Sequence, residues 1–143
     1  MTNGLVDVPV TVVDYGLGNL FSIQRALNYL GASVDITSSP EAIRDAGRLV
    51  IPGVGAFGDG MSQLKERGLI EPILEFAGSG RPLLGICLGM QLLFSESEEF
   101  GLFRGLGLID GSVIRLHDQD PTGRHVKLPH IGWNEIHHTG IRH

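Results

Sequence analysis

The sequence predicts a doubly wound α/β fold with a mostly parallel central sheet, flanking helices and a short antiparallel extension. Short β-branched runs alternate with stretches of helical periodicity, as in parallel strands joined by crossover helices. The 21 glycines fall largely at the ends of apolar runs, where tight strand-to-helix turns need them. With 42% hydrophobic and 19% charged residues, the 143 residues suffice for one domain with a buried core.

The first half of the chain predicts alternating strands and helices. Residues 10–14 form a β-branched run typical of a strand buried on both faces. Asn19 is placed to cap a helix over 20–30, whose apolar residues recur at helical spacing. Residues 33–37 alternate like a more exposed strand. Pro40 then occupies the first position of a short helix.

The middle of the chain continues the alternation. We expect a buried strand at 49–51, helical segments around 61–64 and 70–77, a strand at 82–86 and a helix over 88–94. This order places a short apolar strand directly before the only cysteine of the chain. The fold therefore presents that cysteine at a strand-to-helix turn.

After the cysteine-bearing segment the pattern changes. Asp110-Gly111 is a hairpin signal between short apolar runs at 106–109 and 112–116. The acidic run at 95–99 is interpreted as a solvated end of the preceding helix, at least for its first two glutamates. Residues 131–136 predict a further strand.

Composition excludes several classes of function. The net charge of −5, with scattered Lys and Arg, gives no general attraction to nucleic acid. Residues 1–8 lack the basic region of a secretory signal, and the longest apolar run is too short to span a bilayer. The single cysteine allows no internal disulfide, and the six histidines show no metal-binding spacing. We expect a cytoplasmic protein without a metal or cofactor and without membrane contact.

Cys87 lies in the pattern Gly85-x-Cys87-x-Gly89. Lone cysteines are usually small buried hydrophobes. A cysteine between a buried strand and a helix, with glycines two residues before and after, instead has the spacing of a nucleophile elbow. The turn projects the sulfur above the sheet, and a following helix N-terminus favours the thiolate. Cys87 is therefore a candidate nucleophile.

A second glycine-rich stretch, residues 53–58, matches the dinucleotide-binding pattern G-x-G-x-x-G. That pattern is weak alone, and here it follows the third strand rather than the first. It can be a plain glycine turn, or a flexible backbone strip whose N–H groups face a developing oxyanion.

Together these segments resemble the class I (triad) glutamine amidotransferases. Residues 85–91 are similar to the nucleophile motif of that family, and residues 52–55 to its oxyanion strand. Within the family, residues 14–19, Met90 and residues 129–134 most resemble the glutaminase subunits of imidazole glycerol phosphate synthase, which act in histidine biosynthesis. The resemblance covers nearly the whole chain.

The resemblance implies roles for individual residues. Cys87 would attack the side-chain amide of glutamine, giving a γ-glutamyl thioester and ammonia. The oxyanion would be held by backbone N–H groups of Leu88, Val54 and Gly55. The substrate would be bound by the residues Gly53, Gln91 and Glu99, with Glu99 facing its α-amino group.

The resemblance also implies a partner. Asn19, Trp133 and Asn134 would face a (β/α)8-barrel imidazole glycerol phosphate synthase subunit, with which the protein would form a heterodimer. Ammonia would pass into that barrel and react there with a phosphorylated intermediate. Small-molecule glutamine is the expected substrate.

One part of the family pattern has no match. The triad of the family is completed by a His-x-Glu late in the domain, and no His-x-Glu occurs among the 143 residues. We therefore expect a single amidotransferase domain, 1–143, that is incomplete at the C-terminus, and a form that is inactive or severely impaired alone. The alternatives are an inactive amidotransferase-like binding module and, less favoured, a cysteine hydrolase or redox sensor with the same elbow.

Overall fold

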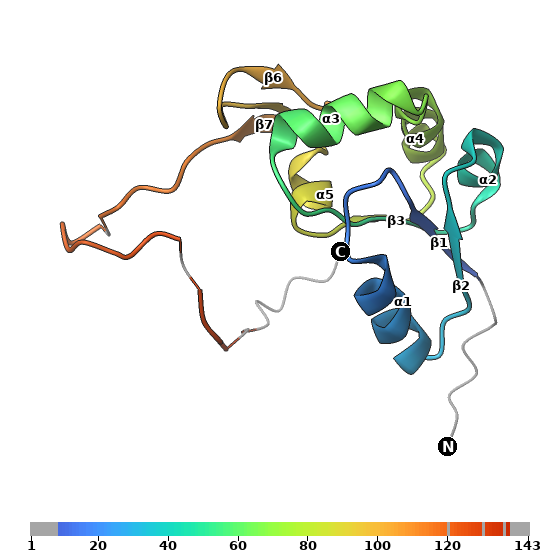
Figure 1. Cartoon of the computed structure of the whole chain (residues 1–143), viewed down its shortest axis with the longest axis horizontal. Coiled ribbons are helices and arrows are strands. Elements are labelled where there is room, and N and C mark those ends of the chain that lie inside the picture. The colour runs from blue at the N-terminus through green and yellow to red at the C-terminus, as the bar shows by residue number, and fades with distance from the viewer. Residues whose placement is uncertain (1–8, 120, 130, 136, 138–143) are drawn as a thin grey trace.

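The computed structural model describes residues 9–119, 121–129, 131–135 and 137. A four-stranded parallel sheet and a three-stranded sheet carry the described part of the chain (Figure 1). The strands are β1 (Val10–Val13), β2 (Val34–Thr37), β3 (Leu49–Ile51), β4 (Leu83–Gly85), β5 (Phe94–Ser97), β6 (Phe103–Arg104) and β7 (Ile109–Val113). The helices are α1 (Leu20–Tyr29), α2 (Pro40–Asp45), α3 (Phe57–Glu66), α4 (Ile70–Gly78) and α5 (Leu88–Gln91).

The larger sheet has the strand order β2-β1-β3-β4, and all of its strands are parallel. Thr11 of β1 aligns with Leu49 of β3, which in turn aligns with Leu83 of β4. Because the strands are parallel, the carboxyl ends of β1, β3 and β4 meet at one edge of the sheet. The predicted fold class is thus confirmed, and it brings three sequence-distant loops together at that edge.

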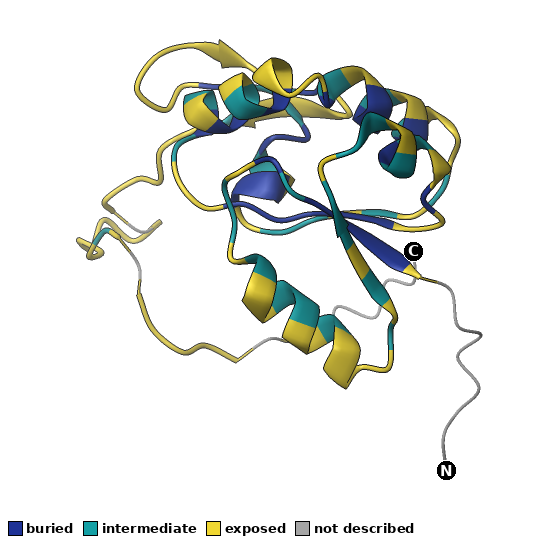
Figure 2. Cartoon of the chain, turned by 45° about the vertical axis from the view of Figure 1, so that its right-hand side comes forward, coloured by how far each residue is buried: buried dark blue, intermediate teal, exposed yellow. Residues whose placement is uncertain are grey.

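Helices cover the two faces of this sheet unequally. One face packs against α2, α3, α4 and α5 through fully buried residues such as Ile43, Leu64 and Phe76. The other face packs against α1, which contributes Leu20 and Leu27 but has no buried residue (Figure 2). The core therefore lies mainly on the face shared by α2 to α5.

Two predicted helix starts are confirmed at atomic detail. The Asn19 side-chain oxygen accepts the N–H of Ser22, 3.1 Å away, and so caps α1. The Ser39 hydroxyl accepts the N–H of Ala42, with Pro40 at the first position of α2. Both caps satisfy backbone donors that the first helical turn leaves without a partner.

The smaller sheet corrects two predictions. Asp110-Gly111 does not form a hairpin turn, because both residues lie inside β7, which pairs in parallel with β5. The helix after the cysteine ends at Gln91, and the first part of the acidic run is strand β5 rather than a helix end. β5 gains strand neighbours on both sides, and this tertiary pairing outweighs the local helix and turn signals.

The described residues after β7 contain an isolated bridge between Gln119 and His125 and no further strand. The strand predicted for 131–136 is therefore wrong for 131–135, and residue 136 lies outside the described residues. The described residues of this segment lie away from both sheets (Figure 1), so no described strand edge is beside them for pairing. In the described part of the chain, no helix has the length and apolar character needed to cross a membrane.

Candidate active site

Cys87 occupies the turn between β4 and α5, as the elbow pattern predicts. Its backbone has φ 56° and ψ −120°, a conformation that residues other than glycine rarely adopt. The Cys87 carbonyl accepts the N–H groups of Met90 at 3.0 Å and Gln91 at 3.1 Å, which holds the turn closed. The thiol side chain is exposed. An exposed cysteine with a strained backbone at a strand-to-helix turn has the geometry of a nucleophile elbow. The strand before it, β4, is the edge strand of the described parallel sheet and is only partly buried.

The two glycines of the elbow are required by close backbone packing. A Cβ at Gly85 would lie 2.5 Å from Met90 Cα, so α5 can fold back onto β4 only past a glycine. A Cβ at Gly89 would lie 1.8 Å from the carbonyl oxygen of Ile51 at the end of β3. The spacing seen in the sequence therefore reflects two backbone contacts that fix where the sulfur projects.

The segment from Pro52 to Gly55 borders the elbow. It leaves β3, the sheet neighbour of β4, and a Cβ at Gly53 would lie 2.8 Å from Leu88 Cβ and 2.9 Å from the Gly89 nitrogen. Gly53 is buried, whereas Val54 is 52% exposed and Gly55 has φ 109°. The structure thus brings the predicted oxyanion segment beside the predicted nucleophile, with its tip open to solvent.

Helix α5 is shorter than the predicted helix over 88–94. Leu88 is its buried first residue, and the N–H of a first helical residue has no acceptor within its own helix. Gln91 is its last residue and is half-buried. A single turn aligns few peptide dipoles, so the field of this helix at the Cys87 side chain is weaker than that of the predicted longer helix.

Glu99 has a contact that the sequence did not predict. Its Oε2 accepts the N–H of Phe57 at 2.8 Å, at the start of α3, whose N-cap residue Ala56 makes no side-chain cap. Glu99 therefore links the turn after β5 in the smaller sheet to the start of α3, which follows closely after the segment from Pro52 to Gly55.

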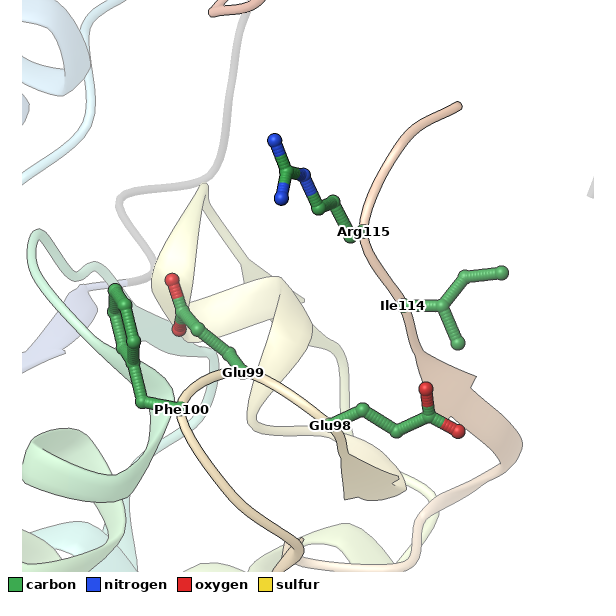
Figure 3. Close-up of a pocket in the computed structure, with 5 residues that line it drawn as sticks. All are labelled: Glu98, Glu99, Phe100, Ile114 and Arg115. Atoms are coloured by element: carbon green, nitrogen blue, oxygen red, sulfur yellow. The ribbon is translucent and has the colours of Figure 1, made fainter. Parts of the chain in front are cut away.

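A cavity of about 450 Å³ lies beside Glu99 and not over Cys87. It is lined by the residues Glu98, Glu99, Phe100, Ile114 and Arg115 (Figure 3). The Arg115 side chain extends across the hollow from the chain segment opposite Glu99. The two carboxylates and one guanidinium give this cavity a mixed charge.

The predicted partner-facing residues are not gathered by the described structure. Asn19 uses its side chain to cap α1. Trp133 is fully exposed, and both it and Asn134 lie on the extended segment after β7. His130, part of the same motif, lies outside the described residues.

Sequence reasoning missed Tyr15 as a residue of this site. Tyr15 lies two residues after the end of β1 and is buried, and its hydroxyl donates a hydrogen bond of 2.6 Å to the Pro52 carbonyl. Burial raises the pKa of Tyr15 well above its ordinary value, and repulsion from the neighbouring Cys87 thiolate raises it further. The available signal was an aromatic residue with a polar tip at the carboxyl end of a buried strand.

Comparison with known proteins agrees with this geometry. The family model "Glutamine amidotransferase class-I" matches residues 11–142. The chain is 55% identical over 127 residues to "Imidazole glycerol phosphate synthase subunit HisH 1" of Legionella pneumophila (strain Lens), covering 89% of this chain and 60% of that protein. It is 51% identical over 128 residues to the subunit HisH of Syntrophotalea carbinolica, covering 89% of this chain and 62% of that protein.

Two solved structures share the fold. A crystal structure of a glutamine amidotransferase superposes with a TM-score of 0.63 at 23% identity, covering 73% of this chain and 56% of that one. A putative peptidase E from Listeria monocytogenes EGD-e superposes with a TM-score of 0.54 at 18% identity, covering 67% and 54%. The chain spans about three fifths of the length of the curated relatives it matches. The match over residues 11–142 shows that this chain belongs to the class-I glutamine amidotransferase family.

Proposed function

We propose that the protein supplies the glutaminase half of an imidazole glycerol phosphate synthase. The observation that carries the proposal is the Cys87 elbow, whose exposed thiol sits at a strained strand-to-helix turn beside Gly53. Similarity to HisH subunits at 50–55% identity supports the same function. The Cys87 elbow and the adjoining segment from Pro52 to Gly55, both of which match motifs of the family, together favour acyl transfer from a side-chain amide.

The proposed chemistry has two balanced steps. The Cys87 sulfur bonds to the amide carbon of glutamine, the carbon–nitrogen bond breaks, and the leaving NH₂ takes the thiol proton and departs as ammonia. Water then attacks the γ-glutamyl thioester, which releases glutamate and restores the thiol. In each step negative charge develops on the carbonyl oxygen, and preorganised N–H donors stabilise that charge.

The residues around the elbow have separate proposed roles. Leu88 offers the unused N–H of a first helical position, and Val54 and Gly55 offer an exposed backbone strip for the oxyanion. Gly53 is proposed to bind the substrate through its backbone, because Tyr15, Leu88 and Gly89 fill the place that a side chain would take there. Gln91 lies one helical turn beyond Cys87 and would contact the substrate's backbone end.

Glu99 is proposed to hold the α-amino group of glutamine. One of its carboxylate oxygens is already bonded to Phe57, and the same side chain lines the cavity of about 450 Å³. A carboxylate held in place at one oxygen loses little freedom when the other oxygen binds an ammonium group. This role requires the substrate to reach from Cys87 toward that cavity.

The partner proposed for this chain is a (β/α)8-barrel synthase subunit in a heterodimer that passes ammonia between the two sites. The names of the HisH relatives describe them as subunits of an imidazole glycerol phosphate synthase, which supports a partner subunit for this chain. Trp133, fully exposed, and Asn134, on the same extended segment, are proposed to be covered by that partner together with Asn19. Tryptophan is one of the residue types enriched at the energetically dominant centres of interfaces. A cytoplasmic location fits these roles.

Turnover of glutamine in the presence of a purified barrel subunit tests the proposal. Because these 143 residues hold no His-x-Glu, we expect ammonia release about 10²- to 10⁴-fold slower than that of the longer Legionella relative. The residual release should disappear in Cys87→Ala, with barrel binding intact. Release that survives Cys87→Ala would contradict the assignment of the nucleophile, and binding without any Cys87-dependent release would favour the binding module.

A further inference from the structure

Tyr15 is held in place by the turn that ends β1. The Asp14 Oδ1 accepts the N–H of Gly16 at 3.0 Å, and Gly16 has φ 89°, which closes a tight turn around Tyr15. The Tyr15 side chain is 1% exposed and belongs to the main hydrophobic core. The turn and the core packing therefore fix the backbone and the ring of Tyr15 independently of its hydroxyl.

The Tyr15 hydroxyl determines the orientation of one peptide group at the candidate active site. It donates to the Pro52 carbonyl over 2.6 Å, across 37 residues of sequence. A trans peptide group is planar, and its C=O and N–H point in opposite directions. Holding the Pro52 carbonyl toward Tyr15 therefore makes the Gly53 N–H point away from Tyr15.

The hydroxyl also touches the next residue of the strip. A Cβ at Gly53 would lie 2.2 Å from the Tyr15 oxygen, so only glycine fits beneath the hydroxyl. Beyond Gly53 the segment is less closely packed, because Val54 is exposed and a Cβ at Gly55 would meet nothing within 4 Å. The hydrogen bond from Tyr15 thus holds the backbone at Pro52, and the exposed residues Val54 and Gly55 follow directly after it.

We propose that Tyr15 is a positioning residue for acyl transfer: its buried hydroxyl holds the Pro52 carbonyl and so orients the Gly53–Gly55 backbone toward the oxyanion formed on Cys87. The inference rests on the proposed glutaminase function. It explains why a tyrosine occupies a core position where a phenylalanine would pack equally well. The electrostatic coupling between Tyr15 and Cys87 agrees with this placement.

Tyr15→Phe separates positioning from packing, because it removes the hydroxyl and keeps the ring. Tyr29→Phe is the matched control, since Tyr29 is 91% exposed on α1 and the chain has two tyrosines. Two reagents label Cys87 by different routes. Iodoacetamide alkylates the thiol directly, whereas the diazoketone analogue of L-glutamine carries a carbonyl that the oxyanion donors bind. With the diazoketone, the thiol proton moves to the diazo carbon, sulfur bonds to that carbon, and N₂ leaves.

The inference predicts a selective effect on the diazoketone. Its labelling rate should fall about tenfold or more in Tyr15→Phe, because displaced donors stabilise the oxyanion poorly. The iodoacetamide rate should stay within about twofold, and Tyr29→Phe should change neither rate. An unchanged ratio of the two rates in folded Tyr15→Phe would overturn the inference.

Amide hydrogen exchange keeps the inference testable apart from the proposed function. Exchange at Gly53, Val54 and Gly55 should accelerate about tenfold in Tyr15→Phe but not in Tyr29→Phe, while exchange in α4 is unchanged. If wild type does not prefer the L-diazoketone to its D-enantiomer, the proposed function fails and this exchange result alone decides the positioning role. Uniform acceleration over all elements would show a merely structural role.

A second labelled form covers the case in which Tyr15→Phe does not fold. In Tyr29→Phe the one remaining tyrosine is Tyr15, so growth on 3-fluorotyrosine marks that position alone. The fluorine signal should move when the L-diazoketone labels Cys87 and should stay in place when iodoacetamide does. Equal shifts with both reagents would contradict a specific link between the hydroxyl and the oxyanion segment.

Discussion

The backbone of Cys87 shows how single residues build the candidate site. A residue other than glycine at φ 56° costs about 1–3 kcal/mol, which the surrounding contacts must offset. Gly85 and Gly89 provide these contacts by letting α5 lie directly on β4 and on the end of β3. The exposed sulfur is therefore held by backbone packing rather than by contacts of its own side chain.

The first prediction concerns Gly89. Gly89→Ala places a methyl group 1.8 Å from the Ile51 carbonyl oxygen, and because the nearest atoms are backbone atoms of Ile51 and Pro52, they leave little room to adjust. We expect the free energy of unfolding to fall by about 3 kcal/mol. Gly78→Ala is the control, because a Cβ there meets nothing within 4 Å; it should change stability by less than about 1 kcal/mol. Equal denaturation midpoints for the two variants would contradict the close packing.

The second prediction concerns the pH dependence of stability. The pKa of Tyr15 is raised in the folded protein, so the unfolded chain, with a tyrosine pKa near 10, loses its proton first. The stability contributed by neutral Tyr15 is fully present below about pH 10 and is lost as the pH rises above that value. Unfolding free energy above pH 10 should fall by about 1.4 kcal/mol per pH unit more in wild type than in Tyr15→Phe. Parallel curves in denaturant titrations would exclude a buried neutral Tyr15.

At the scale of elements, α3 depends on a side chain from another sheet. Its N-cap residue makes no side-chain hydrogen bond, and the Glu99 carboxylate accepts the first N–H instead. A carboxylate at this position also interacts favourably with the helix dipole. The hydrogen bond from Phe57 to Glu99 therefore connects the start of α3, which follows closely after the segment from Pro52 to Gly55, to the turn after β5.

The third prediction follows from that coupling. Glu99→Ala should lower the free energy of unfolding by about 1 kcal/mol, the usual value of a helix cap. Glu98→Ala is the matched control, because Glu98 is the neighbouring residue, is also exposed and lines the same cavity as Glu99. It should change stability by less than about 0.5 kcal/mol in chemical denaturation. A larger loss for Glu98→Ala than for Glu99→Ala would reject the capping role.

Elements differ in how far the sequence predicts them. The four parallel strands and their helices follow from local signals, such as the β-branched run of β1 and the caps Asn19 and Ser39. β5 and β7 do not, because their strand state arises from pairing between segments twelve or more residues apart. A local reading of Asp110-Gly111 predicts a turn, whereas Gly111 instead adopts φ 137° within a strand. In the site, Cys87 and Gly53 were predictable from motifs, but the Tyr15–Pro52 contact depends on the register of β1 and β3.

At the scale of the whole molecule, the described parallel sheet ends at β4. Within the described residues β4 pairs with β3 alone, and its Leu84 side chain is 53% exposed beside a hollow of about 190 Å³. That hollow is lined mainly by apolar residues, among them Val10, Leu27 and Val50. An open strand edge next to an apolar hollow promotes association between chains.

The fourth prediction is that this edge drives self-association. Leu84→Lys should reduce the mean mass measured by light scattering over a concentration series, because a lysine at an edge disfavours strand addition. Leu116→Lys is the control, since Leu116 is also exposed but lies on the segment after β7. Equal reduction by both variants would assign the association to general hydrophobicity instead of the edge.

The intact mass of the chain after exposure to the diazoketone analogue of glutamine tests whether Cys87 is the nucleophile that attacks glutamine. We expect a single adduct, located on Cys87 by peptide mapping, that forms faster with the L-enantiomer than with the D-enantiomer and is absent from Cys87→Ala. Equal rates for the two enantiomers, or an adduct on another side chain, would contradict the assignment of Cys87 as the nucleophile that attacks glutamine.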